Sequence, residues 1–133
     1  MSAIVPNADQ IRALATDPDR GPVVMLNLLK FKDRAEGEEG TGADAYRGYS
    51  DAVIKMVEAL GGRVLWSGRP AHVLIGSEAD RWDAVALVQY PSRQAFLQMA
   101  TSGEYQKIHT HREAGLERTV LIACRPLDAA GLR

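Results

Sequence analysis

The feature that most constrains the fold is Pro22–Phe31 (PVVMLNLLKF), a segment that is apolar on both faces when it is read as a β-strand. Successive side chains of a strand point to opposite faces, so Met25 and Leu26 lie on opposite sides of the sheet. A second segment, Trp82–Tyr90 (WDAVALVQY), has the same character. Strands of this kind are typical of the middle of a sheet that is covered on both faces.

The periodicity and the turn residues predict the remaining elements of the chain. In the first half of the chain we expect a helix over Asn7–Thr16 capped by Asn7, the strand Pro22–Phe31, a charged loop over Lys32–Asp44 and a helix over Ala45–Leu60 capped by Asp44. In the second half we expect a bent edge strand over Arg63–Ile75, the strand Trp82–Tyr90, a helical region over Arg93–Leu116 and a strand over Thr119–Cys124. Ser92 caps that helical region, which breaks near Ser102–Gly103. Pro70 places the second of these extended segments, Arg63–Ile75, at a sheet edge, because proline donates no hydrogen bond to a neighbouring strand.

After the leading helix the order is βαββαβ, which predicts a ferredoxin-like α+β fold. In this fold an antiparallel sheet has the first and third strands at its centre and both helices on one face. We expect a single domain over residues 1–133, with a short extra N-terminal helix and linker (1–21), a ferredoxin-like core (22–125) and a tail (126–133).

Helices on one face leave the other face of the sheet bare, although the central strands are apolar on both sides. Monomeric proteins rarely expose apolar patches of several hundred Å². We therefore predict a homodimer, a dimeric α/β barrel, in which two sheets pack face to face. Strand parity alone does not say which face is the dimer face. The alternative is that the leading helix covers the second face.

Composition narrows the classes of partner. With 16 Lys+Arg and 17 Asp+Glu the formal net charge is −1, so no basic surface for a nucleic acid is expected. No segment reaches the roughly 20 apolar residues of a membrane span, and the first ten residues do not resemble a secretory signal. The single cysteine, Cys124, is typical of a reducing compartment, so we expect a cytoplasmic protein.

Four stretches together resemble an uncharacterised bacterial family of domains of unknown function. They are PVVMLNLLKF, DAYRGYSDAVIKMVEALGGRVLWSG, DRWDAVALVQYPSRQAF and EYQKIHTHREAGLE, and the resemblance extends over about Pro22–Arg125. That family lies in the dimeric α/β-barrel, ferredoxin-like superfamily. The resemblance implies the fold and the homodimer, and it implies no established activity. Wider relatives include cofactor-free monooxygenases, muconolactone isomerases and haem-dependent enzymes. The charged loop Lys32–Asp44 departs from shorter members of the family.

Asn27 is the most informative candidate site residue, because it interrupts an apolar central strand. Burying an unpaired amide costs about 1–3 kcal/mol. Asn27 is therefore either a hydrogen-bond donor that orients a ligand or a structural partner of a loop carbonyl or of Gln89.

His109 and Arg112 are the candidate catalytic residues, because they share a helix face with Tyr105 and Ile108. A histidine there is suited to general acid–base chemistry, although such a histidine is more often an ordinary helix residue. His109 and His111 point about 200° apart on a helix, so they do not share a metal ion. We expect no metal site and no cofactor.

Aromatic residues and one glycine complete the predicted ligand site. Tyr46 and Tyr49 lie on the first turns of the long helix, and Trp66 precedes the bend at Gly68. Apolar pockets with a few polar groups are typical of small-molecule sites, so we expect a small apolar or aromatic ligand. Core or interface packing is the alternative for Trp66, and the charged loop is a candidate lid.

Three functions follow from these residues. The first is a dimer that binds a small organic molecule between sheet and helices. The second is a cofactor-independent enzyme of isomerase or monooxygenase type, with Asn27 orienting the substrate. The third is a non-catalytic stress or accessory dimer.

Overall fold

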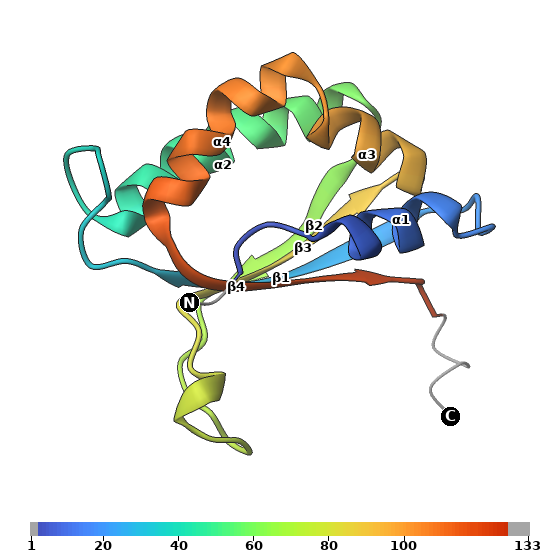
Figure 1. Ribbon diagram of the computed structural model, residues 1–133. Coiled ribbons are helices and arrows are strands. Elements are labelled where there is room, and N and C mark those ends of the chain that lie inside the picture. Colours follow the sequence, from blue (N-terminus) through green and yellow to red (C-terminus); the bar gives the residue numbers. More distant parts are fainter. Residues whose placement is uncertain (1–2, 128–133) are drawn as a thin grey trace.

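The computed structural model describes residues 3–127, and its helices lie on one face of a four-stranded sheet (Figure 1). The elements are α1 (Ala8–Thr16), β1 (Val23–Phe31), α2 (Gly42–Ala59), β2 (Arg63–Gly68), the short helix η1 (Glu78–Asp80), β3 (Ala84–Tyr90), α3 (Arg93–Ala100), α4 (Gly103–Gly115) and β4 (Leu116–Cys124). The strand order is β2-β3-β1-β4, and every neighbouring pair is antiparallel. The predicted ferredoxin-like fold, with the first and third strands at the centre, is confirmed. Most of the predicted tail, residues 128–133, lies outside the described residues.

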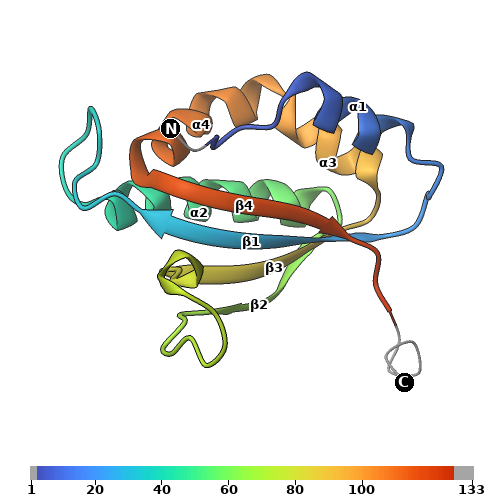
Figure 2. The same ribbon diagram turned by 60° about the horizontal axis from the view of Figure 1, so that its bottom comes forward.

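The leading helix α1 does not cover the second face of the sheet. It lies beside α3, on the helix side and next to the edge strand β4 (Figure 2). Asn7 caps α1 as predicted, in a capping box with Gln10 whose two hydrogen bonds measure 2.8 and 2.9 Å. The alternative that α1 shields the far face is therefore wrong, and that face stays open.

Side-chain caps begin the four described α-helices; the cap at Ser92 was predicted, whereas at Ser102 the sequence indicated only a break in the helical region. Ser92 and Ser102 cap α3 and α4 by accepting hydrogen bonds from the backbone amides of Ala95 and Tyr105. For α2 the prediction is wrong by one turn, because Thr41 is the N-cap and Asp44 is the third helical residue. The pair forms a capping box, since each side chain accepts from the other residue's amide.

The core lies between the sheet and the helices. Its fully buried members come from both layers, namely Val23, Met25, Val57, Tyr90 and Met99. Tyr90 packs edge-on against Phe96 at a ring distance of 5.0 Å. The odd-numbered side chains of β1 therefore face the helices, and the even-numbered ones face away from them.

The edge strand β2 differs from the prediction in length and in parity. It ends at Gly68 instead of continuing to Ile75, because the segment around Pro70 leaves the sheet. A bulge at Leu65 shifts the register, so Val64 pairs with Val88 whereas Trp66 pairs with Leu87. Since Val88 and Leu87 lie on opposite faces, Val64 and Trp66 do too, although they are two residues apart.

The loop after β2, residues 69–83, projects from the sheet on the side away from the helices (Figure 1). Leu74 and Ile75 lie in this loop and are 93% and 95% exposed. Asp83 fastens its end to β1, since its carboxylate accepts a hydrogen bond of 2.8 Å from the amide of Phe31. The loop is thus a projecting arm with an apolar tip.

Two glycines allow the start of α2 to cross the end of α4. The amide of Lys32 donates to the carbonyl of Gly115 (2.8 Å), and the amide of Gly42 donates to the carbonyl of Lys32 (3.0 Å). A Cβ added at Gly42 would lie 2.2 Å from the oxygen of Lys32, and one at Gly115 would lie 2.4 Å from the oxygen of Gly42. Only glycine fits at this crossing.

Arg93 ties the first turn of α3 to the linker between α1 and β1. Its side chain is 4% exposed, and its Nε lies 3.2 Å from an oxygen of Asp17 without the geometry of a hydrogen bond. Its Nη1 lies 3.6 Å from an oxygen of Asp19, which also pairs with Arg125 at 2.6 Å. The hydrogen bonds from Arg125 and from the amide of Gly21 hold the pKa of Asp19 below its ordinary value.

Candidate functional site

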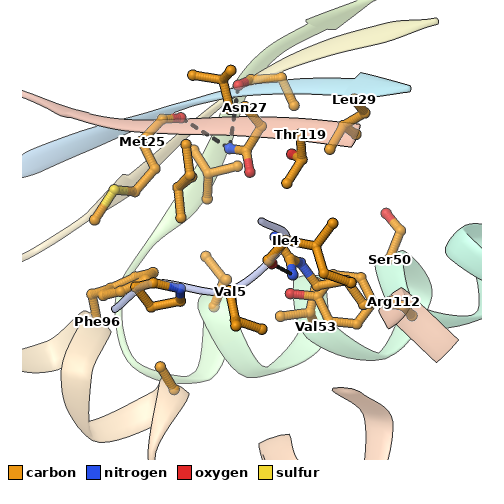
Figure 3. Close-up of a pocket in the computed structure, with 18 of the residues that line it drawn as sticks. Ile4, Val5, Met25, Asn27, Leu29, Ser50, Val53, Phe96, Arg112 and Thr119 are labelled. Carbon is orange, nitrogen blue, oxygen red and sulfur yellow. Dashed lines mark hydrogen bonds between the residues drawn. The ribbon is translucent and has the colours of Figure 1, made fainter. Parts of the chain in front are cut away.

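A cavity of about 1350 Å³ lies between the sheet and the helices. It extends across the width of the sheet, from Ser67 in β2 to Leu121 in β4, and the N-terminal segment with Ile4 and Val5 also lines it. Figure 3 shows Met25, Asn27, Leu29 and Thr119 on the sheet side of this space and Val53 and Ser50 on the α2 side. Its walls are mainly apolar with a few polar groups, which is typical of a small-molecule site.

Asn27 presents its side-chain oxygen to this cavity (Figure 3). Its Nδ2 donates to the carbonyl oxygens of Met25 (3.1 Å) and Ala86 (3.4 Å), so its donors are used by the sheet. Gln89 is not its partner, because Gln89 lies opposite Val24 on the other face. Asn27 thus offers a hydrogen-bond acceptor to a ligand, where the sequence suggested a donor.

Arg112 of α4 points into the same cavity and donates a hydrogen bond to the backbone carbonyl of Ile4 (Figure 3). This bond joins α4 to the segment Ala3–Pro6, which we call the strap. Among residues 3–127 no carboxylate lies within 4.0 Å of the Arg112 guanidinium. The cavity therefore holds a cation whose acceptor is neutral.

A row of aromatic rings forms one wall. Phe31, Tyr46, Tyr49, Tyr105 and His109 follow one another at ring distances of 5.3, 5.2, 6.0 and 5.6 Å. The hydroxyls of Tyr49 and Tyr105 lie 2.8 Å apart and are hydrogen-bonded. Burial raises the pKa of Tyr46 to about 12 and also raises that of Tyr49, so both are neutral at physiological pH. Tyr46 and Tyr49 both line the cavity, as the predicted ligand site requires.

His109 lines the cavity with Arg112, so the structure brings the two predicted catalytic residues together. The Nδ1 of His109 lies 2.7 Å from a carboxylate oxygen of Glu113, one helical turn further on. A carboxylate at this distance orients the imidazole ring. His111 lies elsewhere, with its Nδ1 2.8 Å from Glu38 in the charged loop.

The charged loop is not placed as a lid in this structure. Its amide at Glu36 donates to the carbonyl of Ala114 (3.0 Å), and Glu38 contacts His111. No residue of 32–41 lines the cavity. The loop is fastened to the end of α4 instead.

Trp66 and Gly68 require a correction. Trp66 is 56% exposed on the open face and does not line the cavity, because the bulge at Leu65 turns it to the opposite side from Val64. Gly68 lines one end of the cavity with its backbone, but a Cβ there would lie 2.5 Å from the Trp66 ring. Gly68 makes room for that indole, and we remove Trp66 from the ligand site.

Ser50, Thr119 and the strap were missed in the sequence. Thr119 extends the polar edge of the cavity, although its hydroxyl already donates to the carbonyl of Leu28 at 2.8 Å. A signal existed for the strap, since Ile4 and Val5 are apolar residues next to a helix cap and outside any predicted element. No comparable signal marked Ser50.

The open face carries a second feature, an apolar row across all four strands. Trp66 pairs with Leu87, Leu87 with Leu26, and Leu26 with Ile122. Trp66 and Ile122 are 56% and 46% exposed. We call these four residues the open-face row.

Residues 3–127 contain neither a cluster of metal-ligating side chains nor a membrane-spanning helix. In this range no three His, Cys, Asp or Glu side chains gather as a metal site would need. The helices of the same range include none with the length and hydropathy to cross a membrane.

Solved structures resemble this chain closely. Two crystal structures of the RPA0582 protein, one methylated and one described as a protein of unknown function from Rhodopseudomonas palustris, share 35% sequence identity with it. Their TM-scores are 0.91 and 0.90, and the alignments cover 96% of this chain and 97% and 99% of theirs.

More distant structures show the fold alone. A hydroxynitrile lyase from Passiflora edulis has 11% identity and a TM-score of 0.60, with coverage of 84% of this chain and 98% of that one. A dimeric protein of unknown function with a ferredoxin-like fold, from Bacteroides fragilis, has 14% identity and a TM-score of 0.52, with coverage of 80% and 98%.

No protein of curated function matches the sequence. The family model described as a domain of unknown function, DUF1330, matches residues 37–124, which is more than half of the chain. This match and the 35% identity to RPA0582 agree with the fold. The chain therefore belongs to the DUF1330 family of ferredoxin-like proteins.

Proposed function

We propose that the protein is a homodimer that binds a small, largely apolar organic molecule between its sheet and its helices. The observation that carries the proposal is the cavity of about 1350 Å³, in which apolar walls surround a few polar side chains, chiefly Asn27, Tyr46 and Arg112. Sites of this composition bind small molecules by apolar burial and use the polar groups for orientation.

The dimer rests on the open-face row. Burying about 600 Å² of apolar surface per subunit would contribute on the order of 15 kcal/mol before the costs of association. The dimeric ferredoxin-like neighbours support this arrangement. The net charge of −1 presents little electrostatic barrier to it.

The projecting arm adds to the same interface. It lies on the side of the sheet away from the helices, where a second sheet would pack (Figure 1). Leu74 and Ile75 at its tip would then reach the partner, which accounts for two large apolar side chains that are more than 90% exposed in one subunit.

Light scattering tests the dimer. We expect a mass of two chains at micromolar concentration for the wild-type protein and of one chain for Leu26→Lys, which places a charge in the middle of the open-face row. Ile11→Lys is the matched control, since Ile11 is an exposed apolar residue of α1 on the helix side. A monomeric wild-type protein would refute the dimer.

Thermal unfolding with a library of small organic molecules tests the ligand site. We expect hits that raise the melting temperature and whose density lies next to Asn27 in a crystal. A library without hits, or hits that bind outside the cavity, would refute the site.

A second candidate is a cofactor-independent enzyme of isomerase or monooxygenase type. The specific observation in its favour is the pair His109–Glu113, with 2.7 Å between Nδ1 and Oε1, on a helix that lines the cavity. Here His109 would move a proton and Arg112 would stabilise negative charge. Full turnover by His109→Ala on an identified substrate would exclude this role.

The third alternative, an accessory dimer without a ligand, requires that no molecule binds.

We also propose a cytoplasmic location, because a chain with a single, half-buried cysteine is typical of a reducing compartment.

A further inference from the structure

Four arginines line the cavity within residues 3–127, namely Arg47, Arg69, Arg93 and Arg112, and of these Arg47 and Arg93 already lie within 4.0 Å of protein carboxylates. Arg112 instead donates to a backbone oxygen of the strap. Its guanidinium has five N–H donors in a planar fork that matches a carboxylate. One donor is used by the carbonyl of Ile4. A partly buried guanidinium gains more from an anion than from a neutral carbonyl, so the site is better suited to a charged ligand than to the group that now occupies it.

Two hydroxyls accompany this cation in the cavity. Tyr46 and Ser50 both line it, and neither side-chain hydroxyl has a hydrogen-bond partner among the described residues. Burial raises the pKa of Tyr46, and the charge of Arg112 acts in the opposite direction, which places the cation within electrostatic reach of that hydroxyl. A neutral tyrosine and a serine can both donate hydrogen bonds to an anionic oxygen.

Apolar side chains form most of the remaining wall of the cavity. Figure 3 shows Phe96 at the end away from Ser50, with Met25 and Val53 lining the space as well. A ligand that fills the space next to Arg112 therefore has a mainly apolar or aromatic body and an anionic end.

The strap occupies the anion's place. Among the described residues, the bond from Arg112 to the Ile4 carbonyl is the one hydrogen bond made by Ala3–Pro6. A segment held by one such bond is displaced at small cost, since a typical hydrogen bond contributes about 0.5–1.5 kcal/mol net.

We propose that the ligands of this cavity are apolar or aromatic monocarboxylates, and that their carboxylate binds Arg112 in place of the Ile4 carbonyl. This proposal rests on the proposed function, because it names the class of molecule that the same cavity takes.

Matched pairs of probes test it by calorimetric titration. Phenylacetate is compared with phenylacetamide, and octanoate with octanamide, so that each pair differs in charge and little in shape. For the wild-type protein we expect each carboxylate to bind at least about tenfold more tightly than its amide, because only the carboxylate forms a charge-assisted hydrogen bond with Arg112. For Arg112→Gln we expect that ratio to fall to about one, whereas Arg112→Lys retains part of it.

The ratio within one variant separates charge recognition from changes in folding, because both probes meet the same protein. Ile4→Gly weakens the packing of the strap, and we expect it to tighten phenylacetate binding several-fold. An unchanged affinity in Ile4→Gly would overturn the competition with the strap. Equal binding of amides and carboxylates would overturn the carboxylate assignment and leave the small-molecule site standing. If none of the four probes binds, the carboxylate assignment fails, and the library screen decides the small-molecule site separately.

Discussion

The Nδ2 of Asn27 lies 3.1 Å from the carbonyl oxygen of Met25 in its own strand, and the same atom reaches Ala86 in the neighbouring strand. The amide is therefore held by the sheet, and only its oxygen remains for a ligand. A residue that looked like an interruption of a strand is a fixed acceptor in a cavity.

Replacing Asn27 by leucine should separate stability from binding. The free energy of unfolding should change by less than about 1 kcal/mol, because leucine has the same branched skeleton of side-chain heavy atoms and the backbone carbonyls keep their ladder partners. Affinity for phenylacetamide, whose NH₂ group can donate to the Asn27 oxygen, should fall about fivefold to tenfold. Chemical denaturation and calorimetry measure the two effects. Gln89→Leu is the control on the opposite face, and an equal loss of affinity there would contradict the assignment.

Arg93→Ala should destabilise the protein by about 3 kcal/mol, since the substitution removes a buried cation between Asp17 and Asp19. Arg12→Ala provides the contrast. Its ion pair with Asp9 is exposed, so its loss should cost less than about 0.5 kcal/mol. Urea denaturation of both variants measures the difference, and similar costs would show that the Arg93 contacts do not stabilise the linker.

Two glycines of α2 should respond in opposite directions to alanine. Gly42→Ala should cost about 1–3 kcal/mol, because its Cβ would overlap the backbone of Lys32. Gly48→Ala meets nothing within 4 Å and should stabilise by about 0.5–1 kcal/mol through helix propensity. The melting temperatures of the two variants test this prediction. An unchanged melting temperature for Gly42→Ala would mean that the backbone at the crossing of α2 and α4 shifts to accommodate the added Cβ.

The buried tyrosines make stability depend on pH above 10. The pKa of Tyr46 is raised from its ordinary value of 10.0 to about 12 by burial, and burial also raises that of Tyr49 and of Tyr90. The folded state thus holds these protons more tightly than the unfolded state does. The contribution of Tyr46 to stability is complete below pH 10 and is lost as the pH rises from 10 through about 12, and the contributions of Tyr49 and Tyr90 also decline above pH 10.

Denaturation at a series of pH values, with tyrosinate absorbance, measures this loss. Tyr46→Phe should remove the ionisation near pH 12 and reduce the pH dependence. A stability that stays constant from pH 10 to 12 would contradict the burial of these hydroxyls.

Local chemistry made much of the fold predictable. The alternation of β1 and β3, the caps at Asn7 and Ser92 and the break near Ser102 depend on residues close in the sequence. The errors arose where distant contacts decide. Whether Thr41 or Asp44 begins α2 depends on the crossing with Gly115, and the end of β2 depends on where the arm leaves the sheet.

The site was predictable in part for the same reason. Asn27, Tyr46, Tyr49, His109 and Arg112 lie on faces that periodicity identifies, and all of them line the cavity. Trp66 was misplaced because one bulge at Leu65 reverses the parity of the strand, and sequence alternation does not reveal such a bulge. The contact between Ile4 and Arg112 joins residues 108 positions apart, so no local pattern indicates it.

Because side chains alternate between the two faces along β1, substitutions and insertions in this strand have different effects on the two surfaces of the sheet. Leu26 faces away from the helices and its neighbour Asn27 faces the cavity, so point mutations can alter one surface and leave the other intact. A one-residue insertion in this strand has a different effect, because it exchanges the two surfaces at once. During divergence of the family, therefore, single substitutions can adjust ligand preference freely, whereas insertions and deletions within β1 should be eliminated.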